Sequence, residues 1–339
     1  MSRVTLAHGA GGKAMRELIG GMVLGHFGNP LLGPLEDQAR IAMDELAAQG
    51  DRLAFTTDSF VVDPLEFPGG DIGKLAVYGT VNDLAVSGAR PLYLSCALIL
   101  EEGLELALLD RMLASMKEAA AAAGVSIVTG DTKVVHRGAA DKLFINTAGI
   151  GVVPAGVEIA AHRARPGDVV LVNGYLGDHG AAILQARGEL ALAAGIASDC
   201  QPLHGLVDAM RAACADVRCL RDATRGGLAT VLNEFAESSG VGIRLEEGCL
   251  PVRDTVRGVC EILGLDALYL ANEGKLAAVV PAGDAERVLA AMRAHPAGHD
   301  SRIIGEVIPG RRRRVTLRTA FGSERVVDML VGEQLPRIC

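Results

Sequence analysis

The chain has 339 residues, of which 50% are hydrophobic and 22% are charged, so it is long enough for two domains of about 150 residues each and too apolar to be disordered. A net charge of -8 and an aromatic content of 3%, with no Trp, argue against nucleic acid or an anionic membrane as a partner. No signal peptide or membrane-spanning run is recognisable, and the seven cysteines include no C-x-x-C pair, so we expect a reduced protein of the cytoplasm.

Segments with the patterns of strands and helices alternate as far as residue 153. Continuous apolar runs predict buried strands, and apolar residues at helical spacing predict helices. The expected elements are a strand at 53–56, a helix at 72–87, a strand at 92–100, a helix at 104–123 closed by Gly124, and strands at 126–129 and 143–153. Pro154-Ala155-Gly156 then interrupts the pattern, and we place a domain boundary near residues 154–165.

A second series of elements begins after Pro166-Gly167-Asp168. It comprises a strand at 169–172, a helix after Thr224-Arg225-Gly226-Gly227, a strand at 275–280 and a helix at 285–295. The pattern predicts an α/β (α+β) fold with domains at 1–155 and 156–310 and a flexible C-terminal tail at 311–339. We interpret the basic block Arg311–Arg314 as a solvated connector rather than a polyanion site. At roughly 3.5 Å per extended residue, the tail is long enough to reach the active site of its own chain or of a neighbour.

Two glycine-rich segments each stand beside a lysine. His8-Gly9-Ala10-Gly11-Gly12-Lys13 lacks the ordered β-α-β unit of a dinucleotide fingerprint. Pro68-Gly69-Gly70-Asp71-Ile72-Gly73-Lys74-Leu75 is not a P-loop, because Pro68 replaces the first glycine and Leu75 replaces the final Ser or Thr. Ordinary turns would explain both segments, but backbone amides without side-chain bulk next to a lysine can also cradle phosphate.

Four aspartates stand at or near the ends of predicted elements: Asp58, Asp83, Asp131 and Asp222. Any one of them alone is more simply explained as a turn or helix-capping residue. Asp83 differs because it falls inside an otherwise apolar helical stretch, where burial of an unpaired carboxylate is strongly unfavourable. A cation would remove that cost, and Mg²⁺ prefers a few carboxylates together with phosphate oxygens and water. The aspartates, glycine loops and lysines together predict a Mg-nucleotide site without a P-loop.

The sequence ends on a cysteine, in Leu335-Pro336-Arg337-Ile338-Cys339. Chain ends are the least packed part of most domains, so a thiol there is poorly placed for a core and well placed to visit another site. An accidental surface cysteine is the alternative. Prenylation does not explain it, because that signal places its cysteine fourth from the end.

These residues resemble the HypE family of hydrogenase maturation factors, and the likeness runs essentially end to end. It rests on the opening His8–Lys13, on Thr56–Glu102 with its Gly-Thr-Val-Asn-Asp-Leu-Ala motif, and on Thr129–Lys133. It rests also on Asp222-Ala223-Thr224-Arg225-Gly226-Gly227-Leu228 and on the terminal Pro-Arg-Ile-Cys. The Thr-Gly-Asp and Asp-x-Thr-x-Gly-Gly pieces are shared with the wider aminoimidazole ribonucleotide synthetase (PurM-like) superfamily, whereas the terminal Pro-Arg-Ile-Cys points to HypE.

The resemblance implies a PurM-like two-domain fold, with an N-terminal sheet that pairs across a homodimer and ATP bound between the N-terminal and C-terminal domains. It also implies a reaction in which the carbamoyltransferase HypF loads a carbamoyl group onto the terminal thiol. ATP with Mg²⁺ then drives dehydration of the S-carboxamide to a thiocyanate. The nitrile passes to iron carried by a HypC-HypD complex, as a cyanide ligand of nickel-iron hydrogenase.

The resemblance also implies roles for the acidic residues and one lysine. Asp58, Asp83 and Asp131 match the family's metal and nucleotide ligands. Lys74 and Asp222 match positions that contact phosphate, on weaker grounds.

Three further residues match positions of the reaction itself. Cys339 carries the substrate, Glu273 is the base that takes the carboxamide proton, and Lys133 orients or polarises the carboxamide. Lys133 as a surface lysine and Glu273 as a turn residue remain the simpler alternatives. Two other functions stay open at this point: a PurM-superfamily synthetase or kinase for a small molecule, which has no use for Cys339, and a non-catalytic scaffold.

Overall fold

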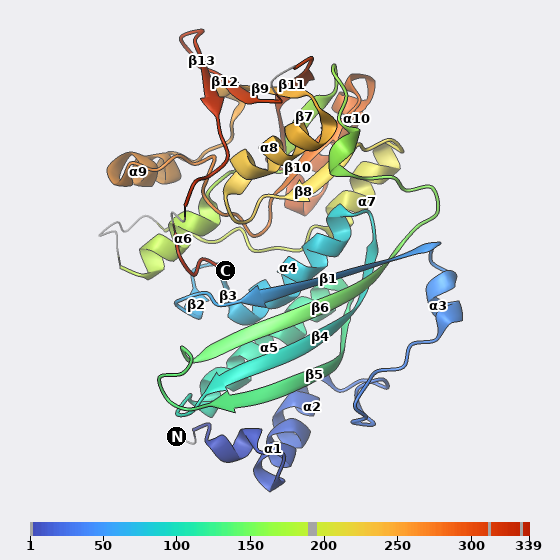
Figure 1. Cartoon of the computed structure of the whole chain (residues 1–339), viewed down its shortest axis with the longest axis vertical. Coiled ribbons are helices and arrows are strands. Elements are labelled where there is room, and N and C mark those ends of the chain that lie inside the picture. The colour runs from blue at the N-terminus through green and yellow to red at the C-terminus, as the bar shows by residue number, and fades with distance from the viewer. Residues whose placement is uncertain (1–2, 189–194, 311–312, 333–334) are drawn as a thin grey trace.

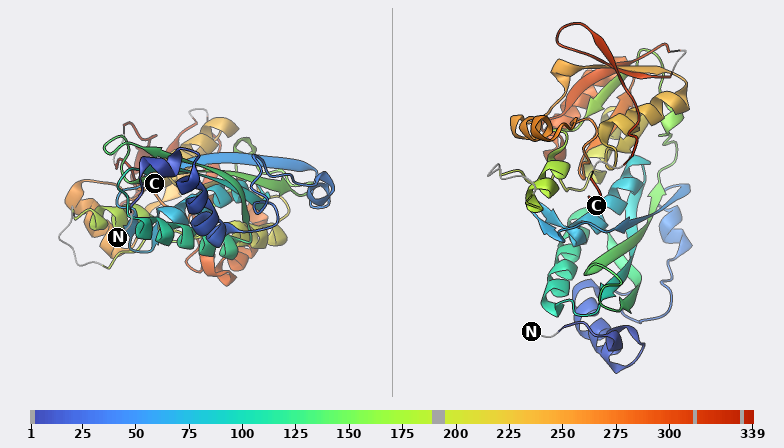
Figure 2. Two further views of the ribbon diagram at one scale, coloured as in Figure 1. Left: turned by 90° about the horizontal axis from the view of Figure 1, so that it is seen from below. Right: turned by 60° about the vertical axis from the view of Figure 1, so that its left-hand side comes forward.

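The computed structural model describes residues 3–188, 195–310, 313–332 and 335–339. The molecule is elongated, with one sheet in the N-terminal half and a second sheet in the C-terminal half (Figure 1). In the right-hand view of Figure 2, the first described residues lie toward one end of the long axis and the C-terminus lies between the two halves. The end of the chain therefore lies at the junction of the halves rather than at an outer tip.

The N-terminal sheet has four strands in the order β1-β6-β4-β5. They are β1 (Arg52–Phe60), β6 (Leu143–Val153), β4 (Arg90–Glu101) and β5 (Ser126–Val135). β6 pairs antiparallel with β1 and β4, whereas β4 and β5 run parallel because helix α5 (Leu106–Ala123) crosses over between them. As predicted, α5 closes at Gly124, whose φ of 67° suits a residue without a side chain.

The two faces of this sheet differ in what covers them. One face packs on α5 and on α4 (Ile72–Val86), and the side chains that point to it, such as Leu98, are buried. The opposite face carries Leu53, Phe55 and Ile99, whose exposed fractions are 56%, 71% and 41%. Figure 1 shows no described helix over that face. We call it the outer face of the N-terminal sheet.

Helix α4 lies between the two halves and is buried on almost every side. It packs on the N-terminal sheet and α5, and also on α7 (His204–Ala213) and β8 (Cys219–Asp222) of the C-terminal half. The helix starts after Asp71, whose carboxylate accepts the backbone N–H of Lys74 at 2.9 Å. A short hairpin of β2 (Glu66–Phe67) and β3 (Gly70–Asp71) precedes it. The polar residues of this helix have partners in both halves. Asn82 bonds backbone groups of the C-terminal half, whereas Thr80 and Asp83 bond threonines of the N-terminal sheet.

The C-terminal sheet has seven strands in the order β13-β12-β9-β11-β7-β10-β8. Besides β8, these are β7 (Val169–Val172), β9 (Gly242–Glu246), β10 (Leu276–Val280), β11 (Arg302–Ile308), β12 (Val315–Arg318) and β13 (Glu324–Val327). Helix α8 (Gly227–Ser239) covers one face, while α7 and α10 (Ala285–Ala294) cover the other. β7 and β10 are therefore buried on both faces, as their continuous apolar sequences predict. Helices α6 (Asp178–Ala186) and α9 (Asp254–Leu263) pack against each other beside this sheet.

Strands β1 and β5 are longer than expected. They continue past residues 56 and 129 to Phe60 and Val135, so Asp58 and Asp131 lie inside strands rather than after them. Both strands are at the edges of the sheet, where charged side chains are tolerated on one side. The charged residues Asp58 and Asp131 therefore do not indicate where these two strands end.

Much of the segment expected to be a flexible tail belongs to the C-terminal sheet. β12 pairs in parallel with β9, β13 pairs with β12, and Val315, Leu317 and Val327 are buried in the core. Arg311 and Arg312 of the basic block lie outside the described residues. Among the described residues of this segment, 328–332 and 335–339 run back toward the N-terminal half (Figure 1).

Three short helices, α1 (Lys13–Leu18), α2 (Leu24–Phe27) and α3 (Met43–Ala47), precede β1. α2 packs on α5 and β5, and α1 follows the first glycine-rich segment. Within the described ranges, no helix combines the length and apolar character needed to cross a membrane.

Candidate active site

Three aspartates from three elements meet where the two halves join. Asp58 projects from β1, Asp83 from α4, and Asp222 ends β8. Thr56 Oγ1 donates to Asp83 Oδ2 at 2.8 Å, and the side chains of Asp58 and Asp83 hydrogen bond to each other. With Arg225, the three aspartates line a cavity of about 460 Å³, which we call the interdomain cavity.

Burial and mutual repulsion make these three carboxyl groups weak acids. Burial and then the charge of Asp83 raise the pKa of Asp58 to about 6. Burial and the charges of Asp83 and Asp58 raise the pKa of Asp222 to about 7. Burial also raises the pKa of Asp83, against the hydrogen bond from Thr56. A divalent cation would remove the repulsion between them.

The donor set of the interdomain cavity fits Mg²⁺ bound together with a phosphate. Across the described residues, no three His, Cys, Asp or Glu side chains are arranged to hold a metal ion by themselves. Mg²⁺ commonly binds a small number of carboxylates, and phosphate oxygens and water then fill its other coordination positions. The cavity therefore suits a metal-nucleotide complex better than a bare structural metal.

Asp131 and Lys133 lie away from the other predicted site residues. Both project from β5, at the opposite edge of the sheet from β1 and Asp58. Lys133 Nζ lies 2.9 Å from Asp131 Oδ2, and the two side chains are 66% and 55% exposed. The hydrogen bond from Lys133 holds the pKa of Asp131 below its usual range. Within one chain, the structure does not bring this pair to Asp58, Asp83 or Glu273.

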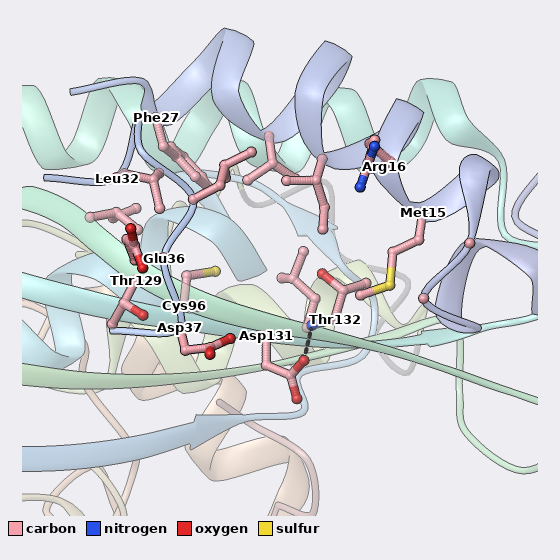
Figure 3. Close-up of a pocket in the computed structure, with 18 residues that line it drawn as sticks. Met15, Arg16, Phe27, Leu32, Glu36, Asp37, Cys96, Thr129, Asp131 and Thr132 are labelled. Atoms are coloured by element: carbon pink, nitrogen blue, oxygen red, sulfur yellow. Dashed lines mark hydrogen bonds between the residues drawn. The ribbon is translucent and has the colours of Figure 1, made fainter. Parts of the chain in front are cut away.

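Asp131 instead lines a second cavity, of about 600 Å³, between β5 and the N-terminal helices (Figure 3). Gly11 and Gly12 of the first glycine-rich segment and Arg16 of α1 also line it. A Cβ added to Gly11 or Gly12 would meet no atom within 4 Å, so there is open space beside both residues. The first glycine-rich segment therefore borders this second cavity and not the interdomain cavity.

Lys74 lies in the first turn of α4. Burial and the charges of Glu273 and Asp71 raise the pKa of the Cys200 thiol, and the positive charge of Lys74 opposes this rise. Asp71, in turn, accepts a hydrogen bond from Ser115 at 2.6 Å. Lys74 therefore lies near the loop that carries Glu273.

The loop that carries Glu273 is held by a buried ion pair. Asp199 accepts the backbone N–H groups of Glu273 and Gly274 at 3.0 and 3.1 Å. Its carboxylate lies 2.9 Å from Lys275 Nζ, and these two side chains are only 3% and 7% exposed. Burial acts to raise the pKa of Asp199, but the Lys275 ammonium and the backbone N–H of Glu273 hold it below its usual range. The loop thus has a fixed position before β10.

One side chain of α4 joins this loop to the N-terminal half. Asn82 Nδ2 donates to the backbone oxygens of Glu273 at 3.3 Å and Gln201 at 3.1 Å. Its Oδ1 accepts the N–H of Leu203 at 2.8 Å. Asn82 is 2% exposed, so these bonds are shielded from water.

The Glu273 carboxyl group lies in a dry and negative environment. The residue is 4% exposed, and its Oε1 has no hydrogen-bond partner. Burial, followed by the charges of Asp199 and Asp222, raises its pKa well above the usual value. The nearest cationic candidate is His179, whose Nε2 lies 4.0 Å from Oε1. A carboxylate in such a place is a strong base.

The end of the chain docks beside Glu273. Val61 N donates to Cys339 O at 3.0 Å, and Arg187 Nη2 donates to Pro336 O at 2.7 Å. Ile338 is 5% exposed and packs into the N-terminal core. The last four residues, expected to be mobile, are thus held by specific backbone hydrogen bonds and apolar contacts.

The thiol of Cys339 faces the same carboxyl groups. Burial and the charge of Glu273 raise the pKa of Cys339 to about 12, against the charge of Arg225, while Asp58 and Asp222 act in the same direction as Glu273. A thiol with this pKa is protonated at neutral pH and is a poor nucleophile. One place in the fold therefore collects Cys339, Glu273 and the aspartates of the interdomain cavity.

Sequence analysis missed several residues of this site. His179, Asp199 and Arg187 have no local signature, because each acts on a segment far away in the chain. Arg225 stands inside the recognised Asp-x-Thr-x-Gly-Gly motif, and the motif itself could have indicated it. Gly227 of this motif is needed for packing: its φ is 59°, and a Cβ there would lie 2.5 Å from Leu268 O.

Two family models match the chain: AIR synthase related protein, N-terminal domain, over residues 36–153, and AIR synthase related protein, C-terminal domain, over residues 165–318. Carbamoyl dehydratase HypE of Rhodobacter capsulatus is 60% identical over 337 residues, which are 99% of this chain and 98% of that protein. The chain belongs to the HypE family. The family resemblance and the PurM-like two-domain α/β fold are thereby confirmed.

Solved HypE structures match the fold over nearly the whole chain. A crystal structure of the hydrogenase maturation protein HypE in complex with ATP has a TM-score of 0.93 and 50% identity, covering 98% of this chain and 99% of that one. A chain of a HypE-HypF complex has a TM-score of 0.80 and 46% identity, covering 92% of this chain and 99% of that one. The two halves therefore have the arrangement of HypE proteins.

Proposed function

We propose that this chain is an ATP-dependent carbamoyl dehydratase that converts an S-carboxamide on its own Cys339 into a thiocyanate. The product supplies the cyanide ligands of nickel-iron hydrogenase. One observation carries the proposal: the terminal thiol is docked beside the buried Glu273 carboxyl group and the aspartates of the interdomain cavity. The Rhodobacter relative bears the name of this activity, and another HypE has been solved with ATP.

The chemistry requires ATP because a carboxamide oxygen is a poor leaving group. Transfer of the γ-phosphoryl group to that oxygen, with loss of one N–H proton, gives an S-bound imidoyl phosphate. Loss of the second N–H proton and departure of phosphate then form the C≡N bond. The overall change is S-carboxamide and ATP to thiocyanate, ADP and phosphate, so no oxidant or reductant is needed.

Glu273 is the base that takes a proton from the carboxamide nitrogen. Its pKa is raised by burial, and its unpartnered Oε1 is free to accept a proton. Water is excluded around it, which also protects the activated intermediate from hydrolysis. The fixed loop on Asp199 and Lys275 keeps the carboxyl group in position.

Asp58 and Asp83 would hold Mg²⁺, and Asp222 stands beside them to complete the charge balance. The ion, when bound, neutralises the charge on the transferring phosphoryl group. Arg225 lies in the same cavity and supplies a further positive charge toward the phosphates. Lys74, at the start of α4, is the weaker candidate for a phosphate contact.

A homodimer would bring Asp131 and Lys133 into this site. The outer face of the N-terminal sheet exposes Leu53, Phe55 and Ile99, which is more apolar surface than a free sheet face usually carries. If two outer faces pack about a two-fold axis along the strands, β5 of one chain lies over β1 of the other, since these are opposite edges. Lys133 of one protomer then completes the site built around Asp58 in its partner.

Loading and delivery of the carbamoyl group must occur with the tail withdrawn. The docked thiol is protonated and enclosed, so it cannot attack a carbamoyl donor where it lies. We assign the loading step to a HypF carbamoyltransferase, because a HypE of this fold was solved in a complex with HypF. We assign acceptance of the nitrile to iron on a HypC-HypD complex, a partner that the family implies.

Mass analysis of the C-terminal peptide tests the proposal. After incubation with HypF, carbamoyl phosphate and ATP, Cys339 should gain a carboxamide. That adduct should then lose one water in a step that needs Mg-ATP. Cys339→Ala should abolish loading and leave nucleotide affinity unchanged. An adduct on any other residue, or loss of water without ATP, would refute the assignment.

A further inference from the structure

His179 is a fully buried polar residue of the site that the reaction above does not use. It belongs to the first turn of α6 and is 0% exposed. Its Nε2 lies 2.7 Å from the carbonyl oxygen of Ile338, the residue before the terminal cysteine. Its Nδ1 lies 2.8 Å from Ser198 Oγ. Phe67 packs edge-on against the ring, with centroids 5.5 Å apart, and fixes its plane.

These contacts define one donor on the imidazole. A carbonyl oxygen can only accept, so Nε2 carries the proton that binds Ile338 O. Nδ1 then accepts from the hydroxyl of Ser198. Burial and the charge of Arg187 lower the pKa of His179, against the charge of Asp199 and the Ile338 carbonyl. The ring is neutral, and its single N–H points at the tail.

The same N–H has a second possible acceptor. Glu273 Oε1 lies 4.0 Å from Nε2 and has no hydrogen-bond partner of its own. If the tail withdraws, the Nε2–H loses Ile338 O and is left buried without a partner, which costs about 1–3 kcal/mol. Rotation of the Glu273 side chain, whose Oε1 no hydrogen bond holds, would then close the gap. The Nε2–H of His179 thus has two acceptors within reach, Ile338 O and Glu273 Oε1, and the position of the tail decides which of them it binds.

We propose that His179 seats the C-terminal tail and thereby leaves Glu273 without a donor, so that the base is free only when the terminal cysteine is in place. With the tail docked, the N–H of His179 binds Ile338 O and Glu273 can accept the carboxamide proton. With the tail withdrawn, the same N–H binds the Glu273 carboxylate and makes it a weaker base. His179 is therefore a positioning residue, and this role rests on the proposed function of Glu273.

Seating by Arg187 is a separate contact. Its guanidinium binds Pro336 O and Arg337 O, which precede the segment held by His179. Loss of the His179 bond should therefore loosen the last two residues, which Val61 and the packing of Ile338 still hold in part, without removing the upstream anchor.

Alkylation of Cys339 by iodoacetamide measures how often the tail is withdrawn. The full-length protein is treated without ATP and without loading, so the result does not depend on the carbamoyl chemistry. Cleavage after Glu333 then separates the Cys339 peptide from the exposed Cys249. His179→Phe keeps a ring against Phe67 but removes the donor, and the Cys339 labelling rate should rise about 2- to 10-fold. His179→Gln keeps an N–H donor and should stay close to the wild-type rate.

The exchange with Glu273 is tested in the same assay. Glu273→Gln removes the charged acceptor that stabilises the withdrawn state, so labelling of Cys339 should slow about 2- to 10-fold. In the His179→Phe background the same substitution should slow labelling much less, because only the direct effect of the Glu273 charge on Cys339 is left. ATP affinity and thermal unfolding of every variant check that the fold is intact.

Three results would overturn the inference. If His179→Phe does not speed labelling, His179 does not seat the tail. If correctly folded His179→Gln labels as fast as the Phe variant, the hydrogen bond is not what seats it. If Glu273→Gln slows labelling equally in both backgrounds, Glu273 does not act through His179. The labelling rates do not depend on the dehydration reaction. The proposed function can therefore be refuted while this inference holds, and the reverse.

Discussion

Replacing Asp199 with Asn should destabilise the protein strongly, because it leaves the Lys275 ammonium buried without a counter-charge. The two side chains are 3% and 7% exposed and lie 2.9 Å apart. Breaking a buried pair from one side costs about 3–5 kcal/mol. For a unit of the size of the C-terminal half, this corresponds to a fall in Tm of roughly 6–20 °C. Lys275→Met should destabilise the protein to a similar extent, because it leaves the Asp199 carboxylate buried without a counter-charge.

The double variant Asp199→Asn with Lys275→Met separates the unbalanced charge from the loss of the side chains. Removing both charges at once leaves no unpaired buried charge, and the Asn side chain still offers an oxygen to the backbone N–H groups of the Glu273 loop, so a large part of the lost stability should return. Urea unfolding of the two single variants and the double variant gives the coupling energy directly. The pKa of Asp199 is held below the ordinary 3.8, so its contribution is present above that pH and is lost on further acidification. Single variants within about 1 kcal/mol of wild type, or a double variant as unstable as the sum, would refute this reasoning.

Three other predictions concern turnover. Glu273→Gln should leave loading of the terminal thiol unchanged and slow the loss of water about 10²- to 10⁴-fold, as measured by the mass of the C-terminal peptide under single-turnover conditions. The raised pKa values of Asp58 and Asp222, about 6 and about 7, mean that ionisation of these carboxyl groups opposes folding as the pH rises through this range. Mg²⁺ should therefore bind weakly below this range and should raise Tm more at about pH 8 than at about pH 5. Equal Mg²⁺ affinity at both pH values, measured by calorimetry, would contradict this. Mixing inactive Lys133→Ala and inactive Glu273→Gln should restore dehydration, because the mixed dimer has one complete site; no recovery after verified exchange of protomers would place both residues in one chain.

Local patterns predicted the buried elements of this fold well. Strand β6 has the predicted limits, residues 143 and 153, and is mostly apolar because it lies inside the sheet, although Asn146 and Thr147 interrupt the apolar sequence. The edge strands β1 and β5 were predicted too short, since polar residues alternate with apolar ones on their exposed sides. The β12–β13 hairpin was assigned to the tail because it follows a run of arginines and is held mainly by pairing with β9, far away in the chain.

The candidate site was predictable where one short motif carries the function. Asp58, Asp83 and Asp222 were recognised from motifs, and they do meet between the halves. His179 and Asp199 were not recognised, because the role of a buried histidine or aspartate depends on partners that are far away in the sequence. The Asp199–Lys275 pair joins residues 76 positions apart, and the His179–Ile338 bond joins residues 159 apart.

The three hydrogen bonds of Asn82 also bear on how the protein moves during turnover. They fasten the loop that carries Glu273 to α4 of the other half, inside a region that water does not enter. A hinge between the halves would have to break all three in each cycle, with no solvent to replace them. Under the proposed function, the part that has to move is therefore the chain end, while the two halves stay joined. Motions of chain termini occur in nanoseconds to microseconds, faster than domain hinges, so movement of the tail itself should not limit the rate of the cycle.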